Sequence, residues 1–305
     1  MKQHIFLFQL HKQPELFGRI IKILASPNHH FLVNVDSKVK NLSDFIESVK
    51  GVDNVHWVGE RVSVFHGGQS QFICTLYMLR EALALPFNFD YFHQISGQDY
   101  PLRSNEQFDD FFERTNKSFM RFDPEESREK WLHTKYANRV NNWWPNTDNF
   151  FTKVYSHTVM KLLSKIFKRS KIDDIWGGWS WFSWNRNTLD FVIRYIDTHP
   201  DYLHRFSHTS CADELIFTTI LKPLTGKLRI EESVPLRYVS WCPKRRMSEV
   251  GKYRPYILNE EDFEDVICAQ AFFCRKVDLL VSAKLLNMID EQRGTRFDFE
   301  KSVPI

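Results

Sequence analysis

Two adjacent carboxylates, Asp213 and Glu214, have the chemistry to accept a proton from a hydroxyl group. A general base takes such a proton while the hydroxyl oxygen attacks another centre. The pair precedes the apolar run 215–217, so we expect it to open a helix, with Glu214 as the candidate base. Acidic residues in a first helical turn also commonly do no more than complement the positive end of the helix. The residues by themselves leave both interpretations open.

A second group of side chains has the charge to hold a phosphate. Arg275 and Lys276 are adjacent, and Arg254 precedes Pro255. An arginine can donate two parallel hydrogen bonds to phosphate oxygens, and a lysine acts as a point charge. Basic pairs are usually solvated surface patches, which is our interpretation of the run 244–246. Arg275, Lys276 and Arg254 are therefore candidate phosphate ligands with a plain surface role as the alternative.

Strand and helix patterns alternate through the first third of the chain. Alternation of this kind is typical of βαβ units, so we predict an α/β fold with a mostly parallel sheet flanked by helices. The predicted strands are Ile5–Leu10, Phe31–Val35, Val55–Val58 and Tyr91–Ile95. The predicted helices are Pro14–Ala25, Leu42–Val49, an apolar stripe from Phe72 to Leu83, and a capping-box helix from Ser104 to about Thr115.

Polar residues follow two of these strands, at the sheet edge where ligands of parallel sheets bind. Asp36 ends the second strand, and a loop containing Ser96, Gly97 and Asp99 ends the fourth. We expect Gly97 to adopt a backbone angle that other residues resist. Asp36 and Asp99 can contact a ligand, or they can simply hold their turns by accepting hydrogen bonds from backbone amides.

The charge and cysteine content exclude several classes of protein. Lys and Arg number 41 against 38 Asp and Glu, a near balance that is unlike a dedicated nucleic-acid binder. Five scattered cysteines without a CxxC pair favour reduced thiols. The N-terminal segment lacks the apolar length of a signal peptide, and no apolar run reaches the ~20 residues of a membrane span. We therefore expect a cytoplasmic protein.

The middle of the chain, from about residue 123 to 171, is polar, aromatic and irregular. Its last part, Met160–Lys171, predicts a basic amphipathic helix. Such a helix packs on the core of the protein or attaches to an anionic membrane surface.

Four blocks of sequence, in order and spacing, resemble one enzyme family. They are FLVNVDSK at 31–38, DYFHQISGQDYPLR at 90–103, GWSWFS at 178–183 followed by ADE at 212–214, and FFCRKVD at 272–278. Together they resemble the core-2/I-branching β-1,6-N-acetylglucosaminyltransferases (glycosyltransferase family 14), which include the peptide O-xylosyltransferases. The resemblance spans roughly residues 5 to 278, and SGQDYPL is its most specific piece. One departure is Asn34, where many members carry His.

The resemblance implies a GT-A-like fold and inverting, metal-independent transfer from a UDP-sugar, with N-acetylglucosamine or xylose as the sugar. It implies one domain over residues 1–305, with a nucleotide-sugar lobe at about 1–122, an acceptor lobe and diphosphate segment at about 123–280, and a C-terminal helix and tail at 281–305. A cytoplasmic member would use a saccharide or lipid-linked saccharide acceptor, and Met160–Lys171 would then face the membrane.

The same resemblance gives each candidate residue a role. Glu214 becomes the general base and Asp213 its orienting neighbour. The remaining assignments are Arg275, Lys276 and Arg254 to the diphosphate, Asp36 to the uridine or ribose, the loop with Ser96, Gly97 and Asp99 to the floor under the donor, and Trp181 to the acceptor side. A tryptophan face suits a sugar ring, although a buried core Trp is the ordinary alternative.

Two other classes of function compete with this interpretation. A metal enzyme is one, but none of the 12 histidines forms HxxxH or HExxH, and the acidic triplet 298–300 lies too near the C-terminus for a DxD motif. We expect no metal cofactor. The other is a non-catalytic module that binds single-stranded nucleic acid or a membrane surface through interleaved basic and aromatic residues. Here such residues are spread along the chain, so we expect no nucleic-acid partner.

Overall fold

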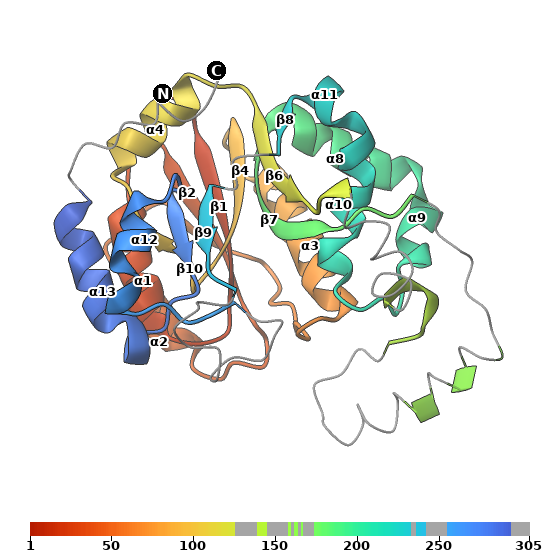
Figure 1. The fold of residues 1–305 in the computed structure, drawn as a ribbon, viewed down its shortest axis with the longest axis horizontal. Coiled ribbons are helices and arrows are strands. Elements are labelled where there is room, and N and C mark those ends of the chain that lie inside the picture. Colours follow the sequence, from red (N-terminus) through yellow and green to blue (C-terminus); the bar gives the residue numbers. More distant parts are fainter. Residues whose placement is uncertain are drawn as a thin grey trace.

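The computed structural model describes residues 1–125, 139–144, 158–159, 162–163, 166, 174–232, 236–241 and 255–293. Within them, a seven-stranded sheet runs through the centre of the molecule in the order β3-β2-β1-β4-β7-β6-β8 (Figure 1). Its strands are β1 (His4–Leu10), β2 (His29–Val35), β3 (Val55–Trp57), β4 (Tyr91–Ser96), β6 (Ser118–Phe122), β7 (Gly178–Asn185) and β8 (Ile230–Glu231).

The sheet is mostly parallel, as predicted. Strands β3, β2, β1 and β4 pair in parallel, and β6 pairs with β8 in parallel. Only β7 runs against its neighbours β4 and β6 in this sheet of the described residues. A second sheet, in the order β5-β10-β9, is made by β5 (Tyr100–Pro101), β10 (Phe273–Arg275) and β9 (Arg237–Val239).

Helices cover both faces of the large sheet (Figure 1). The α-helices are α1 (Pro14–Leu24), α2 (Leu42–Ser48), α3 (Gln69–Ala84), α4 (Asn105–Glu113), α8 (Arg186–Thr198), α9 (Pro200–Arg205), α10 (Ile216–Leu221), α11 (Thr225–Leu228), α12 (Phe263–Cys268) and α13 (Leu279–Gln292). The 3-10 turns are η1 (Ala212–Glu214), η2 (Lys222–Leu224) and η4 (Glu260–Asp262). No described helix is long and apolar enough to cross a membrane.

The predicted elements of the first third are confirmed to within a few residues at each end. The capping box also forms: the Ser104 hydroxyl accepts a hydrogen bond from the Gln107 amide, and the Gln107 side chain accepts one from the Ser104 amide. Alternating side chains of β1 enter two separate cores, because successive residues of a strand point to opposite faces. Ile5 and Leu7 join the core under α3, α8 and α10, and Phe6 and Phe8 join the core under α1, α4 and α13.

The topology brings distant segments to one edge of the sheet. The carboxyl ends of β1, β2 and β4 lie together there because the strands are parallel. The segment after β10 joins them through Gln98, whose backbone carbonyl and side-chain amide bond to the backbone of Val277 at 3.1 Å each. The basic pair near the C-terminus is therefore fixed beside the loop that follows β4.

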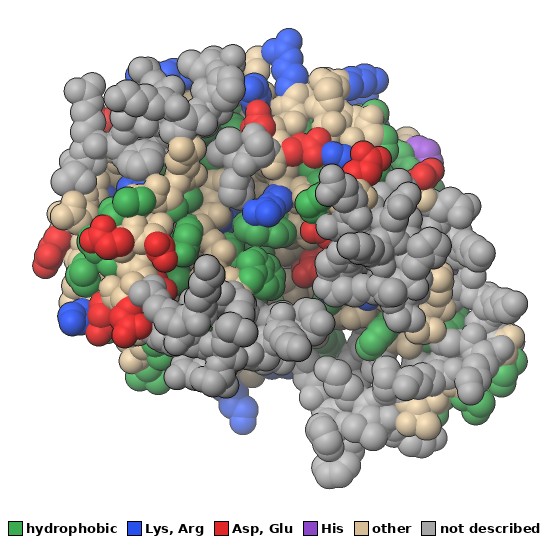
Figure 2. Space-filling model, viewed as in Figure 1, with side chains coloured by type: hydrophobic (Ala, Val, Ile, Leu, Met, Phe, Trp, Pro, Cys, Tyr) green, Lys and Arg blue, Asp and Glu red, His purple; other side chains and the backbone are tan. Residues whose placement is uncertain are grey.

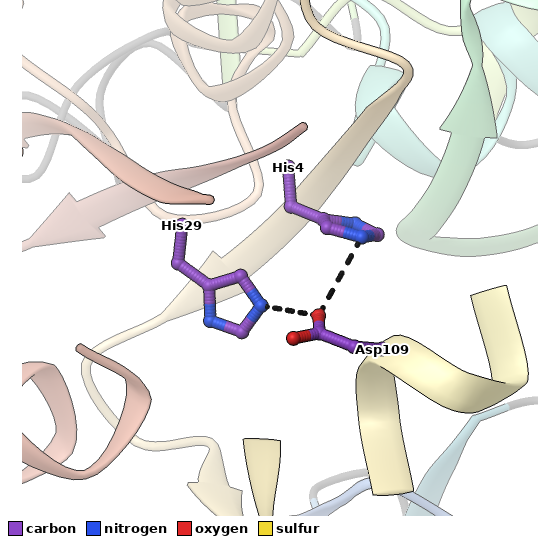
Figure 3. A group of neighbouring side chains, drawn as sticks. All are labelled: His4, His29 and Asp109. Carbon is purple, nitrogen blue, oxygen red and sulfur yellow. Dashed lines mark hydrogen bonds and ion pairs between the residues drawn. The ribbon is translucent and has the colours of Figure 1, made fainter. Parts of the chain in front are cut away.

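A buried polar cluster lies at the opposite, amino-terminal end of β1 and β2 (Figure 3). His29 Nδ1 lies 2.7 Å from the Leu24 carbonyl oxygen, and its Nε2 lies 2.8 Å from Asp109 Oδ1 on α4. His4 Nε2 lies 3.8 Å from the same oxygen. Sequence spacing gave no sign of this cluster, because its members come from three different elements.

Both nitrogens of the His29 ring lie within hydrogen-bond distance of oxygen atoms, so the ring joins β2 to α4 through Asp109 and to the end of α1 through Leu24. Burial acts to raise the pKa of Asp109, but the hydrogen bond and charge of His29 outweigh it and the pKa is lowered. Burial lowers the pKa of His4 to about 3, so that ring is neutral. We interpret the cluster as a structural link between β1, β2 and α4.

Candidate active site

A cleft of about 1280 Å³ opens at the carboxyl ends of β1, β2 and β4. Figure 2 shows basic, acidic and hydrophobic side chains close together around the hollow in the middle of the face it views. Most of the predicted site residues line this cleft: Asp36, Ser96, Gly97, Trp181, Asp213, Glu214, Arg275 and Lys276. Asp99 lies beneath it, fully buried, and Arg254 falls outside the described residues.

The two adjacent carboxylates lie in the 3-10 turn η1, before α10 begins at Ile216, and not in the first turn of an α-helix as predicted. The turn is set up by Cys211, which has a left-handed backbone (φ 50°) and whose amide bonds to the Gly67 carbonyl at 2.8 Å. This arrangement places Glu214 at the cleft with 37% of its side chain exposed. Arg139 Nη1 donates to Glu214 Oε2 at 2.6 Å.

Asp213 differs sharply from its neighbour in environment. It is only 6% exposed, whereas 37% of the Glu214 side chain is exposed. Burial, and then the negative charge of Glu214, raise the pKa of Asp213 to about 7. Two carboxylates that share a poorly hydrated site do not easily carry two negative charges, so Asp213 holds a proton more readily than an ordinary aspartate.

Arg275 makes several contacts with the loop that follows β4. Its Nη1 donates to Ser96 Oγ at 2.8 Å and to both Asp99 carboxylate oxygens at 2.8 and 2.9 Å. Its guanidinium carbon also lies 3.9 Å from the centre of the Trp181 ring. Asp99 Oδ2 in turn accepts the Ser96 amide at 2.6 Å. Asp99 therefore holds the loop and orients Arg275. Of the two roles predicted for it, ligand contact or support of its turn, the structure shows the support of the turn.

Asp36 likewise supports a turn at the edge of the cleft. Its two oxygens accept the backbone amides of Lys38 at 2.9 Å and Val64 at 3.2 Å. These bonds join the end of β2 to the segment that leads toward α3. Asp36 still lines the cleft, so a contact with the donor stays a prediction.

The reason for a glycine at position 97 differs from the one predicted. Among the described glycines only Gly51 and Gly67 have positive φ, so Gly97 does not need an unusual backbone angle. Instead, a Cβ atom at Gly97 would lie 2.7 Å from the Leu10 side chain. The prediction of a special backbone conformation at Gly97 was wrong. The feature that the structure shows instead is the close approach of this loop to the Leu10 side chain at the end of β1.

The structure adds residues that the sequence did not single out. His11, directly after β1, and His66, before α3, line the cleft. Arg139 also lines it, although it lies 75 residues from Glu214 in the chain and follows no recognisable motif. Most of the predicted helix at 160–171 falls outside the described residues; within it, Leu162 and Ile166 are 59% and 63% exposed.

Comparison with known proteins gives consistent matches across most of the chain. A family model described as Core-2/I-Branching enzyme matches residues 5–267. Xylosyltransferase 2 of Pan troglodytes and of Homo sapiens are each 24% identical over 287 residues, covering 89% of this chain and 31% of theirs. The chain thus spans about a third of the length of the curated relatives it matches.

Two solved structures are among the matches in the structural comparison. Mouse xyloside xylosyltransferase 1 in its apo form has a TM-score of 0.41 and 11% identity, covering 90% of this chain and 97% of that one. The galactosyltransferase LgtC, in complex with donor and acceptor sugar analogs, has a TM-score of 0.41 and 8% identity, covering 95% of each chain.

Proposed function

Because this chain belongs to the Core-2/I-branching enzyme family, we propose that it transfers a sugar from a UDP-sugar to a hydroxyl group of an acceptor saccharide. We propose inversion at the anomeric carbon and no divalent metal. One observation carries this proposal: a single cleft holds a half-exposed carboxylate, Glu214, and a basic segment, Arg275–Lys276, at the ligand-binding edge of the sheet. The names of the relatives favour xylose as the first donor to test, with N-acetylglucosamine as the alternative.

The reaction is a direct displacement. The acceptor oxygen forms a bond to the anomeric carbon from the side opposite UDP, while Glu214 takes the hydroxyl proton. The bond from the anomeric carbon to the β-phosphate oxygen breaks, and UDP leaves with the electron pair. Positive side chains placed where this charge gathers stabilise the transition state. Lys276 and the exposed edge of Arg275 are proposed to do this.

The side chains that line the cleft favour a diphosphate site made of basic residues over one made of a divalent metal ion. A divalent cation such as Mg²⁺ or Mn²⁺ requires carboxylate or similar oxygens to bind it. Two of the three carboxylates among the cleft's described residues already have protein partners: Asp36 accepts backbone amides, and Glu214 accepts Arg139. The third, Asp213, has a pKa raised to about 7, which weakens it as a ligand of a divalent cation.

Turnover of the donor in water tests the proposed reaction without knowledge of the acceptor. With UDP-α-D-xylose or UDP-α-N-acetylglucosamine in EDTA, we expect release of UDP, since water can replace the acceptor hydroxyl. Proton NMR of the first product should show the β anomer before mutarotation, because the displacement inverts the centre. GDP-mannose serves as the control donor. First formation of the α anomer would contradict inversion, and turnover of GDP-mannose alone would contradict a uridine donor.

A further inference from the structure

Arg139 is held beside η1, the turn that carries Asp213 and Glu214, by its backbone as well as its side chain. Its carbonyl accepts the Ser210 amide at 3.4 Å, one residue before Cys211. In the same segment, the Trp144 amide bonds to the His208 carbonyl at 2.9 Å. The Arg139 side chain is 15% exposed and reaches Glu214 Oε2 at 2.6 Å. The ion pair between Arg139 and Glu214 is therefore fixed by the surrounding backbone and is not a chance contact of two mobile surface side chains.

This contact occupies only one side of the Glu214 carboxylate. Arg139 Nη1 bonds to Oε2, and Oε1 accepts no hydrogen bond from any residue that the structure describes. Within the described residues, the Glu214 carboxylate is thus held at one oxygen, which defines its orientation. It can take a proton from a hydroxyl group that enters the cleft.

The two carboxylates differ in environment. Glu214 bonds to the Arg139 guanidinium, which stays charged at any pH that the protein tolerates. Asp213 is buried, and burial and then the charge of Glu214 raise its pKa to about 7, against a smaller lowering by the charge of Arg139. Burial, and then the charge of Glu214, also raise the pKa of the Cys211 thiol to about 11, so this thiol stays neutral. Among the described residues, Arg139 is the cation that bonds to Glu214.

We propose that Arg139 is a positioning residue that fixes the Glu214 carboxylate and aims its Oε1 oxygen at the acceptor hydroxyl. This proposal rests on the proposed function of Glu214 as the base. A carboxylate that is already held in one orientation loses less freedom when it meets the acceptor hydroxyl, so proton transfer to it is favoured.

The test compares Arg139→Gln, Arg139→Lys and wild type in kcat and KM for UDP-xylose hydrolysis. In Arg139→Gln we expect kcat to fall by at least about tenfold with little change in KM, because the Glu214 carboxylate is no longer held in place. Arg139→Lys can still donate a hydrogen bond to Glu214 and should recover most of the loss. Affinity for UDP should stay within about twofold in all three. Arg80→Gln, which breaks an exposed ion pair with Asp197, is the matched control.

A double variant tests whether Arg139 acts through Glu214. Arg139→Gln added to Glu214→Gln should lower the rate by less than about twofold further, because the base that it positions is already absent. A kcat in Arg139→Gln equal to that of wild type, or an equal loss from Arg139→Gln in both backgrounds, would overturn the proposal. Wild-type hydrolysis by Glu214→Gln would instead overturn the base assignment.

Discussion

Replacing Glu214 by Gln is expected to lower the rate of sugar transfer by at least about 100-fold, the usual contribution of a general base. Glutamine keeps the size of the side chain and can still contact Arg139 through its carbonyl oxygen, but it cannot accept the hydroxyl proton. Affinity for UDP should change by less than about twofold, because the side chain is proposed to meet the acceptor and not the diphosphate. Donor turnover and UDP calorimetry on the same preparation separate the two effects.

The control for this variant is Glu47→Gln, which removes an exposed carboxylate paired with Lys50 on the protein surface. It should behave as wild type in both assays, since exposed ion pairs contribute little. Transfer by Glu214→Gln at more than about a tenth of the wild-type rate would show that another group takes the proton.

Replacing Lys276 by Ala is expected to weaken UDP binding by at least about tenfold, the effect of losing one charge-assisted contact with a phosphate. Lys276 lines the cleft, and its backbone is fixed by bonds to Tyr256 at 3.3 Å and Leu258 at 2.9 Å. The substitution therefore removes a charge without disturbing the position of the chain. Calorimetry in EDTA measures the change, with Lys50→Ala on the surface as the control. Unchanged affinity would remove Lys276 from the proposed diphosphate site.

Arg275 needs a different design, because it also supports the fold. Asp99 is fully buried, and the only cation bonded to it among the described residues is Arg275. Removal of one partner of a buried ion pair costs roughly 3–5 kcal/mol of folding free energy. Arg275→Ala is thus expected to lose both UDP binding and stability, whereas Arg275→Lys keeps a charge beside Asp99. Thermal unfolding of each variant is needed before its affinity is interpreted.

The sequence was sufficient to predict those helices and strands that local residue patterns determine. The apolar run of β1, the helical stripe of α3 and the Ser104–Gln107 capping box are set by neighbouring residues, and the structure confirms all three. The turn that carries Glu214 was less predictable. Its 3-10 form depends on the left-handed backbone of Cys211 and its bond to Gly67, a contact between segments 144 residues apart.

The candidate site shows the same difference between features set by local sequence and features set by contacts between distant segments. Glu214, Arg275 and Lys276 were chosen from motifs, and the structure brings them to one cleft. Motifs did not show that Asp99 and Trp181 both contact Arg275, or that Arg139 pairs with Glu214, since these contacts arise only when the chain folds. The partners of a site residue determine its charge and orientation, and local sequence does not contain them.

We propose that a UDP-sugar binds to this cleft through protein cations and not through a metal, and calorimetry of wild-type protein with UDP in excess EDTA is the sharpest test. We expect binding with a dissociation constant on the order of micromolar, equivalent to about 8 kcal/mol, and no gain when EDTA is replaced by Mn²⁺. Binding that appears only after Mn²⁺ is added would contradict this proposal, because a metal and not Lys276 and Arg275 would then hold the diphosphate.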